Sequence, residues 1–136
     1  MATIIKDIRL KASPEKVWAA LCDVGNIHNR LARGFVTETR LEGNERIVCF
    51  INGVVVRERL VSLDHDLRRL AYSAASERLD HHHASFQVFS DDEGTRLVWI
   101  ADLLPDGMAE IIGGMMEAGA TAIRNTLDED VVVQMA

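Results

Sequence analysis

The sequence predicts an α+β fold in which one antiparallel sheet packs against a long C-terminal helix. Two observations predict it. From Phe35 onward, apolar or alternating runs are separated by turn signals about every 8 to 12 residues, a spacing that is typical of an antiparallel meander. Beyond Pro105, apolar residues recur every three or four positions, which predicts a helix with one apolar face.

The size and charge of the chain restrict what it can be. A chain of 136 residues, 48% hydrophobic and 26% charged, fits one compact domain, so we expect a single domain over 1–136. The formal net charge of −6 argues against nucleic acid as a partner. No window approaches the ~20 apolar residues that span a bilayer, and the start lacks a signal-peptide pattern, so we expect a cytoplasmic protein without stable membrane insertion.

Local signals predict the first elements. Residues 3–10 alternate as a strand does. Ser13 is a candidate N-cap, Pro14 suits the first helical position and Glu15 favours the positive helix end, so we expect a helix over 14–22. The following stretch, which ends near Gly34, is expected to form a second short helix or a turn.

Turn signals divide the rest of the chain into six strands, which makes seven with the first. The turn signals are Gly43-Asn44, Asn52-Gly53, Asp64 to Asp66, a longer link over 75–80, and Asp91 to Gly94. The final helix is predicted from the spacing of Ile112, Met115, Met116, Gly119, Ile123 and Leu127.

Turn lengths predict which residues face each other, because side chains alternate along a strand and a short turn fixes the register. We read Asn52-Gly53 as a two-residue turn, Asp64 to Asp66 as a three-residue turn and Asp91 to Gly94 as a four-residue loop. The predicted opposite pairs are Glu38/Cys49, Ile47/Glu58, Cys49/Val56, Glu58/Tyr72, Leu60/Leu70, Ala84/Ala101, Phe86/Trp99 and Val88/Leu97.

One face then collects apolar residues for the C-terminal helix to cover, together with polar residues that need partners. This mixture predicts a hydrogen-bond network or a pocket with polar anchors. The polar members are Glu58, Tyr72 and His82, with Glu38 and Arg40 nearer one edge. The apolar members are Ile47, Cys49, Ile51, Val56, Leu60, Leu70, Ala84, Phe86, Val88, Leu97, Trp99, Ala101 and Leu103.

The opposite face is also predicted to be apolar. That amount of apolar surface indicates either a second packing layer or a homodimer interface. The residues predicted on this face are Phe35, Val48, Phe50, Val55, Val98 and Ile100.

The run His81-His82-His83 has the composition of a metal cluster, but strand alternation divides it. His82 is predicted to point inward and its two neighbours outward, and three consecutive strand residues cannot close on one metal ion. Cys22 and Cys49 lack Cys-x-x-Cys spacing, so we expect free thiols. The sequence therefore predicts no metal site, and it indicates no cofactor.

Three segments carry a resemblance to the helix-grip (SRPBCC) superfamily, namely "SPEKVWAAL", "RIVCFINGVVVRERLVSLDHDLRRLAYS" and "HASFQVFSDDEGTRLVWIADLLP". This superfamily includes StAR-related lipid-transfer domains, birch-pollen-type allergens, plant abscisic acid receptors and bacterial polyketide cyclase/dehydrase-like proteins. The resemblance covers nearly the whole chain. It implies a curved seven-stranded sheet gripping the C-terminal helix, with a cavity for an apolar or amphipathic molecule. Glu58 stands where many relatives place a pocket glutamate, and His82 where relatives often have an inward tyrosine.

We therefore predict a protein that binds a small hydrophobic or amphipathic ligand. Glu58, Tyr72 and His82 would orient the ligand, and Phe86, Trp99 and Met116 would line its cavity. One alternative is a cyclase- or dehydratase-like enzyme, in which His82 is the acid or base and Glu58 sets its tautomer. Another is a homodimeric interaction module without a small ligand. Binding is favoured over catalysis because the sequence shows no complete catalytic motif.

Overall fold

The computed structural model describes residues 1–135, and side chains through residue 129. The predicted α+β fold is confirmed, with a seven-stranded antiparallel sheet, two short helices after the first strand and a long C-terminal helix. The predicted domain ends at Ala136, which lies outside the described residues. The elements are β1 (Ala2–Leu10), α1 (Pro14–Cys22), α2 (Ile27–Arg30), β2 (Val36–Glu42), β3 (Glu45–Phe50), β4 (Val55–Asp64), β5 (Arg69–Ala75), β6 (His81–Asp91), β7 (Gly94–Leu104), η1 (Asp106–Met108) and α3 (Ala109–Met135).

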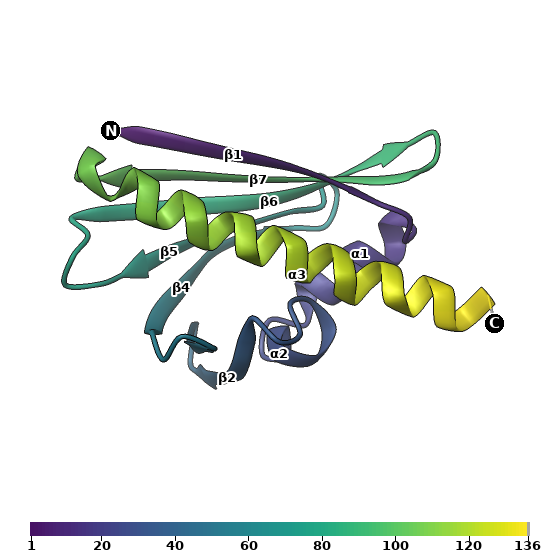
Figure 1. Ribbon diagram of the computed structural model, residues 1–136, viewed down its shortest axis with the longest axis horizontal. Coiled ribbons are helices and arrows are strands. Elements are labelled where there is room, and N and C mark those ends of the chain that lie inside the picture. The colour runs from purple at the N-terminus through teal and green to yellow at the C-terminus, as the bar shows by residue number, and fades with distance from the viewer. Residues whose placement is uncertain (136) are drawn as a thin grey trace.

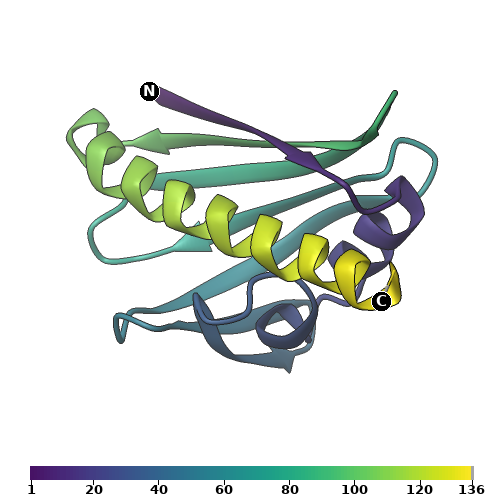
Figure 2. The ribbon, with the colours of Figure 1, turned by 45° about the vertical axis from the view of Figure 1, so that its right-hand side comes forward.

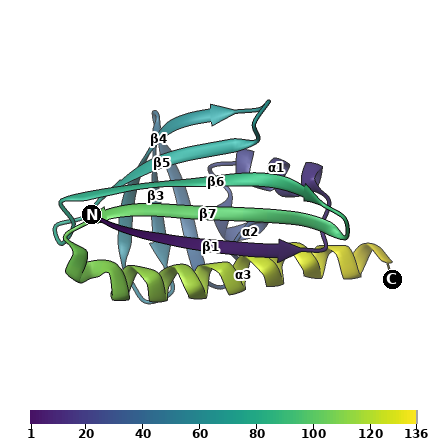
Figure 3. The same cartoon turned by 90° about the horizontal axis from the view of Figure 1, so that it is seen from above.

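The strands follow the order β1-β7-β6-β5-β4-β3-β2, so β1 and β2 are the two edges. Helix α3 crosses one face of the sheet along its length (Figures 1 and 2). Seen from above, β1, β6 and β7 run along α3, whereas β3 and β4 turn steeply away from it (Figure 3). The sheet is therefore curved, and its concave face is turned toward the helix.

The core lies between this concave face and the helices. Helix α1 begins as predicted, because Ser13 Oγ accepts a hydrogen bond from the Lys16 amide and Pro14 occupies the first position. Its buried residues join inward residues of the sheet and of α3 in one cluster. Leu97 and Ala101 of β7 and Ile123 of α3 are almost completely buried there.

Two hairpins keep the predicted inner face. The predicted pairs of β6 and β7 are confirmed, including Phe86 opposite Trp99, although the strands run on until Asp91 pairs with Gly94. In β4 and β5, Glu58 faces Ala74 and Leu60 faces Tyr72, so the predicted pairing is wrong by two residues. The turn is longer than predicted and β4 has a bulge, but a shift of two residues leaves side chains on the same face.

The register of the β3–β4 hairpin differs from the predicted register by one residue, which exchanges the inner and outer faces of β3. Its turn has three residues, because the Phe50 amide donates to the Val54 carbonyl oxygen at 2.9 Å and Gly53 has a φ of 88°. Val48 therefore faces Val56, and Arg46 faces Glu58. The predicted inward positions of Ile47, Cys49 and Ile51 are wrong, and so are the predicted outward positions of Val48 and Phe50.

The reversal of β3 extends to the edge strand β2. Cys49 faces Glu38 as predicted, but both now belong to the outer face. The predicted inward positions of Glu38 and Arg40 are therefore wrong, and both residues are exposed. The residues of β2 that are buried are Val36 and Thr39, which face Phe50 and Val48 across the ladder.

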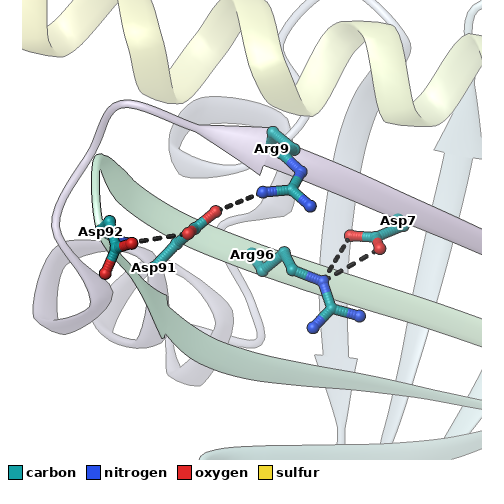
Figure 4. A network of polar contacts seen from close by, with 5 residues as sticks. All are labelled: Asp7, Arg9, Asp91, Asp92 and Arg96. Atoms are coloured by element: carbon teal, nitrogen blue, oxygen red, sulfur yellow. Dashed lines mark hydrogen bonds and ion pairs between the residues drawn. The ribbon is translucent and has the colours of Figure 1, made fainter.

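The outer face carries ion pairs beside its apolar residues. Arg96 of β7 holds both carboxylate oxygens of Asp7, at 2.9 and 3.1 Å, and Arg9 of β1 binds Asp91 (Figure 4). Val55 is 61% exposed, whereas Val98 and Ile100 are half-buried. The predicted outward position of Phe35 is also wrong, because Phe35 lines the cavity together with Val48 and Phe50, so the outer apolar surface is smaller than predicted.

Candidate ligand-binding cavity

A cavity of about 370 Å³ lies between the concave face of the sheet and α3. This volume is within the range of sites that hold small organic molecules. Residues from α2, from strands β2 to β7 and from the first half of α3 line it. All six residues predicted to contact a ligand are among the lining residues, namely Glu58, Tyr72, His82, Phe86, Trp99 and Met116.

Three aromatic rings from adjacent strands form the floor of the cavity. The rings of Phe86 and Trp99 are stacked with centroids 4.7 Å apart, and those of Tyr72 and Phe86 are 6.3 Å apart. Trp99 Nε1 donates a hydrogen bond to Tyr72 Oη at 3.1 Å, which joins the two ends of the row. The floor is thus a rigid apolar surface with one hydroxyl group at its edge.

Helix α3 forms the roof and approaches this floor closely at Gly119. A Cβ atom at that position would lie 3.1 Å from a ring carbon of Trp99 and 3.2 Å from one of Phe35. Met115 and Met116 line the cavity from the same helix, and their flexible thioethers can adapt to different ligand shapes. Because Gly119 has no side chain, the helix can lie this close to the rings of Trp99 and Phe35.

A buried ion pair forms the polar part of the lining. Arg46 Nε donates to Glu58 Oε1 at 2.7 Å, and the two side chains are only 5% and 9% exposed. The guanidinium carbon also lies 5.3 Å from the centre of the Tyr72 ring, and Arg46 Nη1 donates to the Val24 carbonyl oxygen at 3.4 Å. Each charge compensates the other, so this polar end of the cavity carries no net charge.

Tyr72 keeps its proton throughout the physiological range. Burial raises the pKa of its hydroxyl far above the ordinary value, and the negative charge of Glu58 raises it further. The hydroxyl oxygen accepts from Trp99, and its proton has no acceptor among the described residues. It is therefore available to donate a hydrogen bond to a molecule in the cavity.

His82 lines the cavity as a neutral imidazole. It faces the fully buried Leu103 of β7, which agrees with its predicted inward position, while His81 is exposed on the other face. Burial lowers the pKa of His82, and electrostatic repulsion from the neighbouring His81 and His83 lowers it further. At neutral pH its ring can accept one proton and donate another.

The three polar residues do not form one network. Strand β5 separates Glu58 on β4 from His82 on β6, which places their backbones about 10 Å apart. Among the described residues, His82 has no hydrogen bond to Glu58 or Tyr72, and Glu58 instead binds Arg46. Glu58 is therefore not in position to set the tautomer of His82.

The cavity opens near the turn between β3 and β4, the link between β5 and β6, and the start of α3. The most exposed lining residues come from these segments, and they include Val54, Arg78 and Ile111.

Among the described residues, no group of three or more His, Cys, Asp or Glu side chains is arranged to hold a metal ion.

Sequence reasoning missed the lining that comes from β3 and α2. Arg46, Val48 and Phe50 line the cavity because the faces of β3 are reversed, and Ile27 of α2 and Leu31, which directly follows α2, line it as well. One signal could have identified the ion pair. Arg46 and Glu58 lie at equal distances from Asn52, so a three-residue turn centred on Asn52 brings these opposite charges together.

The chain belongs to the polyketide cyclase/dehydrase and lipid transport family, whose model matches residues 1–128. No curated protein sequence matches it. The helix-grip architecture that the resemblance implied is confirmed by this match and by solved structures of the same fold.

None of the described helices combines the length and hydropathy needed to cross a bilayer.

Several solved structures share the fold at low sequence identity. XoxI from Bacillus cereus aligns with a TM-score of 0.79 at 21% identity, covering 93% of this chain and 96% of that one. A START superfamily protein from Mycobacterium smegmatis gives 0.76 at 12% identity, with 93% and 97% covered. The protein Ara h 8.0201 gives 0.72 at 15% identity, with the same coverage of 93% and 97%.

Proposed function

We propose that this protein binds a small, mainly apolar molecule in the cavity between its sheet and α3. The observation that carries the proposal is a preformed space of about 370 Å³ with an aromatic floor and a charge-balanced polar end. Family membership supports it, because the family description includes lipid transport. The apolar walls would supply most of the affinity, at roughly 25 cal/mol for each Å² of apolar surface buried.

The polar residues would orient the ligand. The Tyr72 hydroxyl can donate to a carbonyl or hydroxyl oxygen, and the neutral ring of His82 can donate or accept. Because Arg46 is already paired with Glu58, the polar end favours a neutral group over a carboxylate or phosphate. The proposed ligand is thus an apolar molecule with one or two neutral polar groups.

The proposal is tested by filling the cavity from the sheet. Ala74 lines the cavity opposite Glu58, whereas the next residue, Ala75, is exposed opposite Arg57. The protein and its Ala74→Trp and Ala75→Trp variants are purified from its own host and examined by native mass spectrometry. We expect a bound small molecule on the unmodified protein and on Ala75→Trp, and its loss from Ala74→Trp.

The same three proteins are then titrated with the neutral fluorescent dye 1-aminoanthracene. Binding to the unmodified protein and to Ala75→Trp, but not to Ala74→Trp, supports the cavity as the site. Equal binding by both variants, or no bound molecule and no dye binding in any of them, would show that the cavity is not a ligand site.

One observation favours a second candidate, a cyclase- or dehydratase-like enzyme. His82 is a neutral imidazole facing the cavity without a hydrogen-bond partner among the described residues, which suits a general base. Glu58 has no part in this reaction, because it binds Arg46. The enzyme proposal requires that His82→Gln abolish turnover of a polyketide-like substrate while substrate binding is kept.

A further inference from the structure

A second cavity of about 220 Å³ is lined by residues that neighbour the polar end of the first, and it is open to solvent at Val61, Ser62 and Leu63. The two cavities have no lining residue in common, but their linings are neighbours in the sheet. Leu60 of the second cavity faces Tyr72 of the first, and Leu70 of the second faces Phe86 of the first. The second cavity is lined by Cys22, Val24, Leu60, Val61, Ser62, Leu63 and Leu70.

The side chains of Arg46, Glu58 and Tyr72 line the first cavity beside residues that line the second, Val24 and Leu60. All three line the first cavity and are less than a tenth exposed. Arg46 reaches from β3 past Glu58, and its Nη1 donates to the carbonyl oxygen of Val24, which lines the second cavity. Glu58 lies one inward position before Leu60 on β4. The ion pair thus lies on the side of the first cavity that is nearest to Val24 and Leu60.

We propose that the Arg46–Glu58 pair is the inner wall that limits the length of the molecule bound in the first cavity. This inference rests on the proposed function. A ligand too long for the first cavity could extend only by separating the two charges, and a buried charge without its partner is costly. The second cavity has a mainly apolar lining, which a longer apolar molecule would contact if it passed the position of the removed pair.

The test uses straight-chain primary alcohols of increasing length, which displace 1-aminoanthracene from the full chain. In the unmodified protein, affinity should rise about fourfold with each methylene and stop rising once the first cavity is full. We call the chain length at which affinity stops rising the break. Arg46→Ala/Glu58→Ala removes both charges and their bulk, so the break should move to longer alcohols. For the alcohol two carbons beyond the original break, we expect about 15-fold tighter binding than to the unmodified protein.

The matched control is Arg46→Met/Glu58→Leu, which removes the charges and keeps the bulk. Its break should stay at the original chain length. A break at the same length in both double variants, or an equal move in both, would overturn the inference. If no dye binds to any of the three proteins, the proposed function itself fails, which is a different result.

Circular dichroism checks that each variant is folded. If the double-alanine variant does not fold, Arg46→Ala/Glu58→Leu is used in its place, because it removes both charges but only the bulk of the Arg46 side chain, which reaches Val24. The expected shift to longer alcohols is the same, and an unshifted break in that variant overturns the inference.

Discussion

Arg46 and Glu58 place two opposite charges at a position where both side chains are almost completely buried. Such a pair has a good contact energy but also a large desolvation cost, so the pair itself adds little net stability. Removing only one partner is much more destabilising than removing both, because the other charge then remains buried without its partner. The stability of this site therefore depends on whether the charges are removed singly or together.

We expect Glu58→Leu to lower the free energy of unfolding by about 3–5 kcal/mol, because it leaves the Arg46 charge uncompensated. Arg46→Met/Glu58→Leu should regain most of this loss. Urea denaturation at neutral pH measures both variants. The matched control is Arg57→Met/Glu42→Leu, which removes an exposed pair and should change little. A single variant as stable as the double variant would contradict the buried pairing.

The neutral state of His82 predicts a pH dependence of stability. Because burial lowers the pKa of His82 in the folded protein, the unfolded chain takes up this proton first as the pH falls below about 6.5. The stability that neutral His82 contributes above this pH is lost as the pH falls towards its folded pKa. Urea unfolding on both sides of about pH 6.5 measures the loss.

In His82→Gln this part of the pH dependence should disappear, since glutamine does not titrate. An NMR titration of the imidazole resonances gives an independent reading, with His82 titrating below the ordinary histidine value of about 6.5. An unchanged pH profile in His82→Gln would contradict the assignment of a buried, neutral imidazole.

At the scale of elements, the glycines of α3 differ in what surrounds them. Gly114 is exposed and a Cβ atom there would meet nothing within 4 Å, whereas at Gly119 it would press on Trp99 and Phe35. Gly114→Ala should therefore stabilise the protein by about 1 kcal/mol through helix propensity alone. Gly119→Ala should gain less or be destabilising. Thermal unfolding of both variants measures the difference, and equal gains would contradict the close approach of the helix at Gly119.

The sequence was sufficient for those parts of the fold that local patterns determine. The Ser13-Pro14 helix start, the apolar period of α3 and the hairpin of β6 and β7 were all predicted with little error. The inward position of His82 follows from the same alternation, because β6 and β7 pair without a bulge. These features depend on residues that are close in the chain or joined by a short turn.

The β3 side of the cavity could not be predicted in the same way. Asn52-Gly53 is a strong signal for a two-residue turn, and the actual turn includes Ile51 as well. A strand has a side-chain period of two, so a one-residue error in the turn reverses the whole strand, whereas the two-residue error between β4 and β5 had no such effect. Local sequence does not determine turn length well enough to decide between these cases.

The whole molecule presents one concave face to the cavity and α3, and one convex face to solvent. The convex face was predicted to be a candidate homodimer interface, but Val48 and Phe50 line the cavity instead. At Val98, the neighbouring outward residues across the ladder are Asp7 and Gln87. An interface here would have to bury the ion pair of Asp7 and Arg96 (Figure 4).

We therefore expect a monomer in light scattering. Val98→Lys should leave the measured mass unchanged. A mass of two chains that falls to one chain in Val98→Lys would instead support the homodimer, with the outer face as its interface.

The three-residue turn around Asn52 has a consequence for how such a protein can diversify. Deleting one turn residue would keep every residue of β3 and exchange its two faces, so that Ile47 and Cys49 would enter the cavity and Arg46 would leave Glu58. A new ligand preference could thus arise from a change in loop length, without any substitution of a lining residue. When homologous chains are compared, a gap at this turn should be given more weight than a difference at any single cavity position.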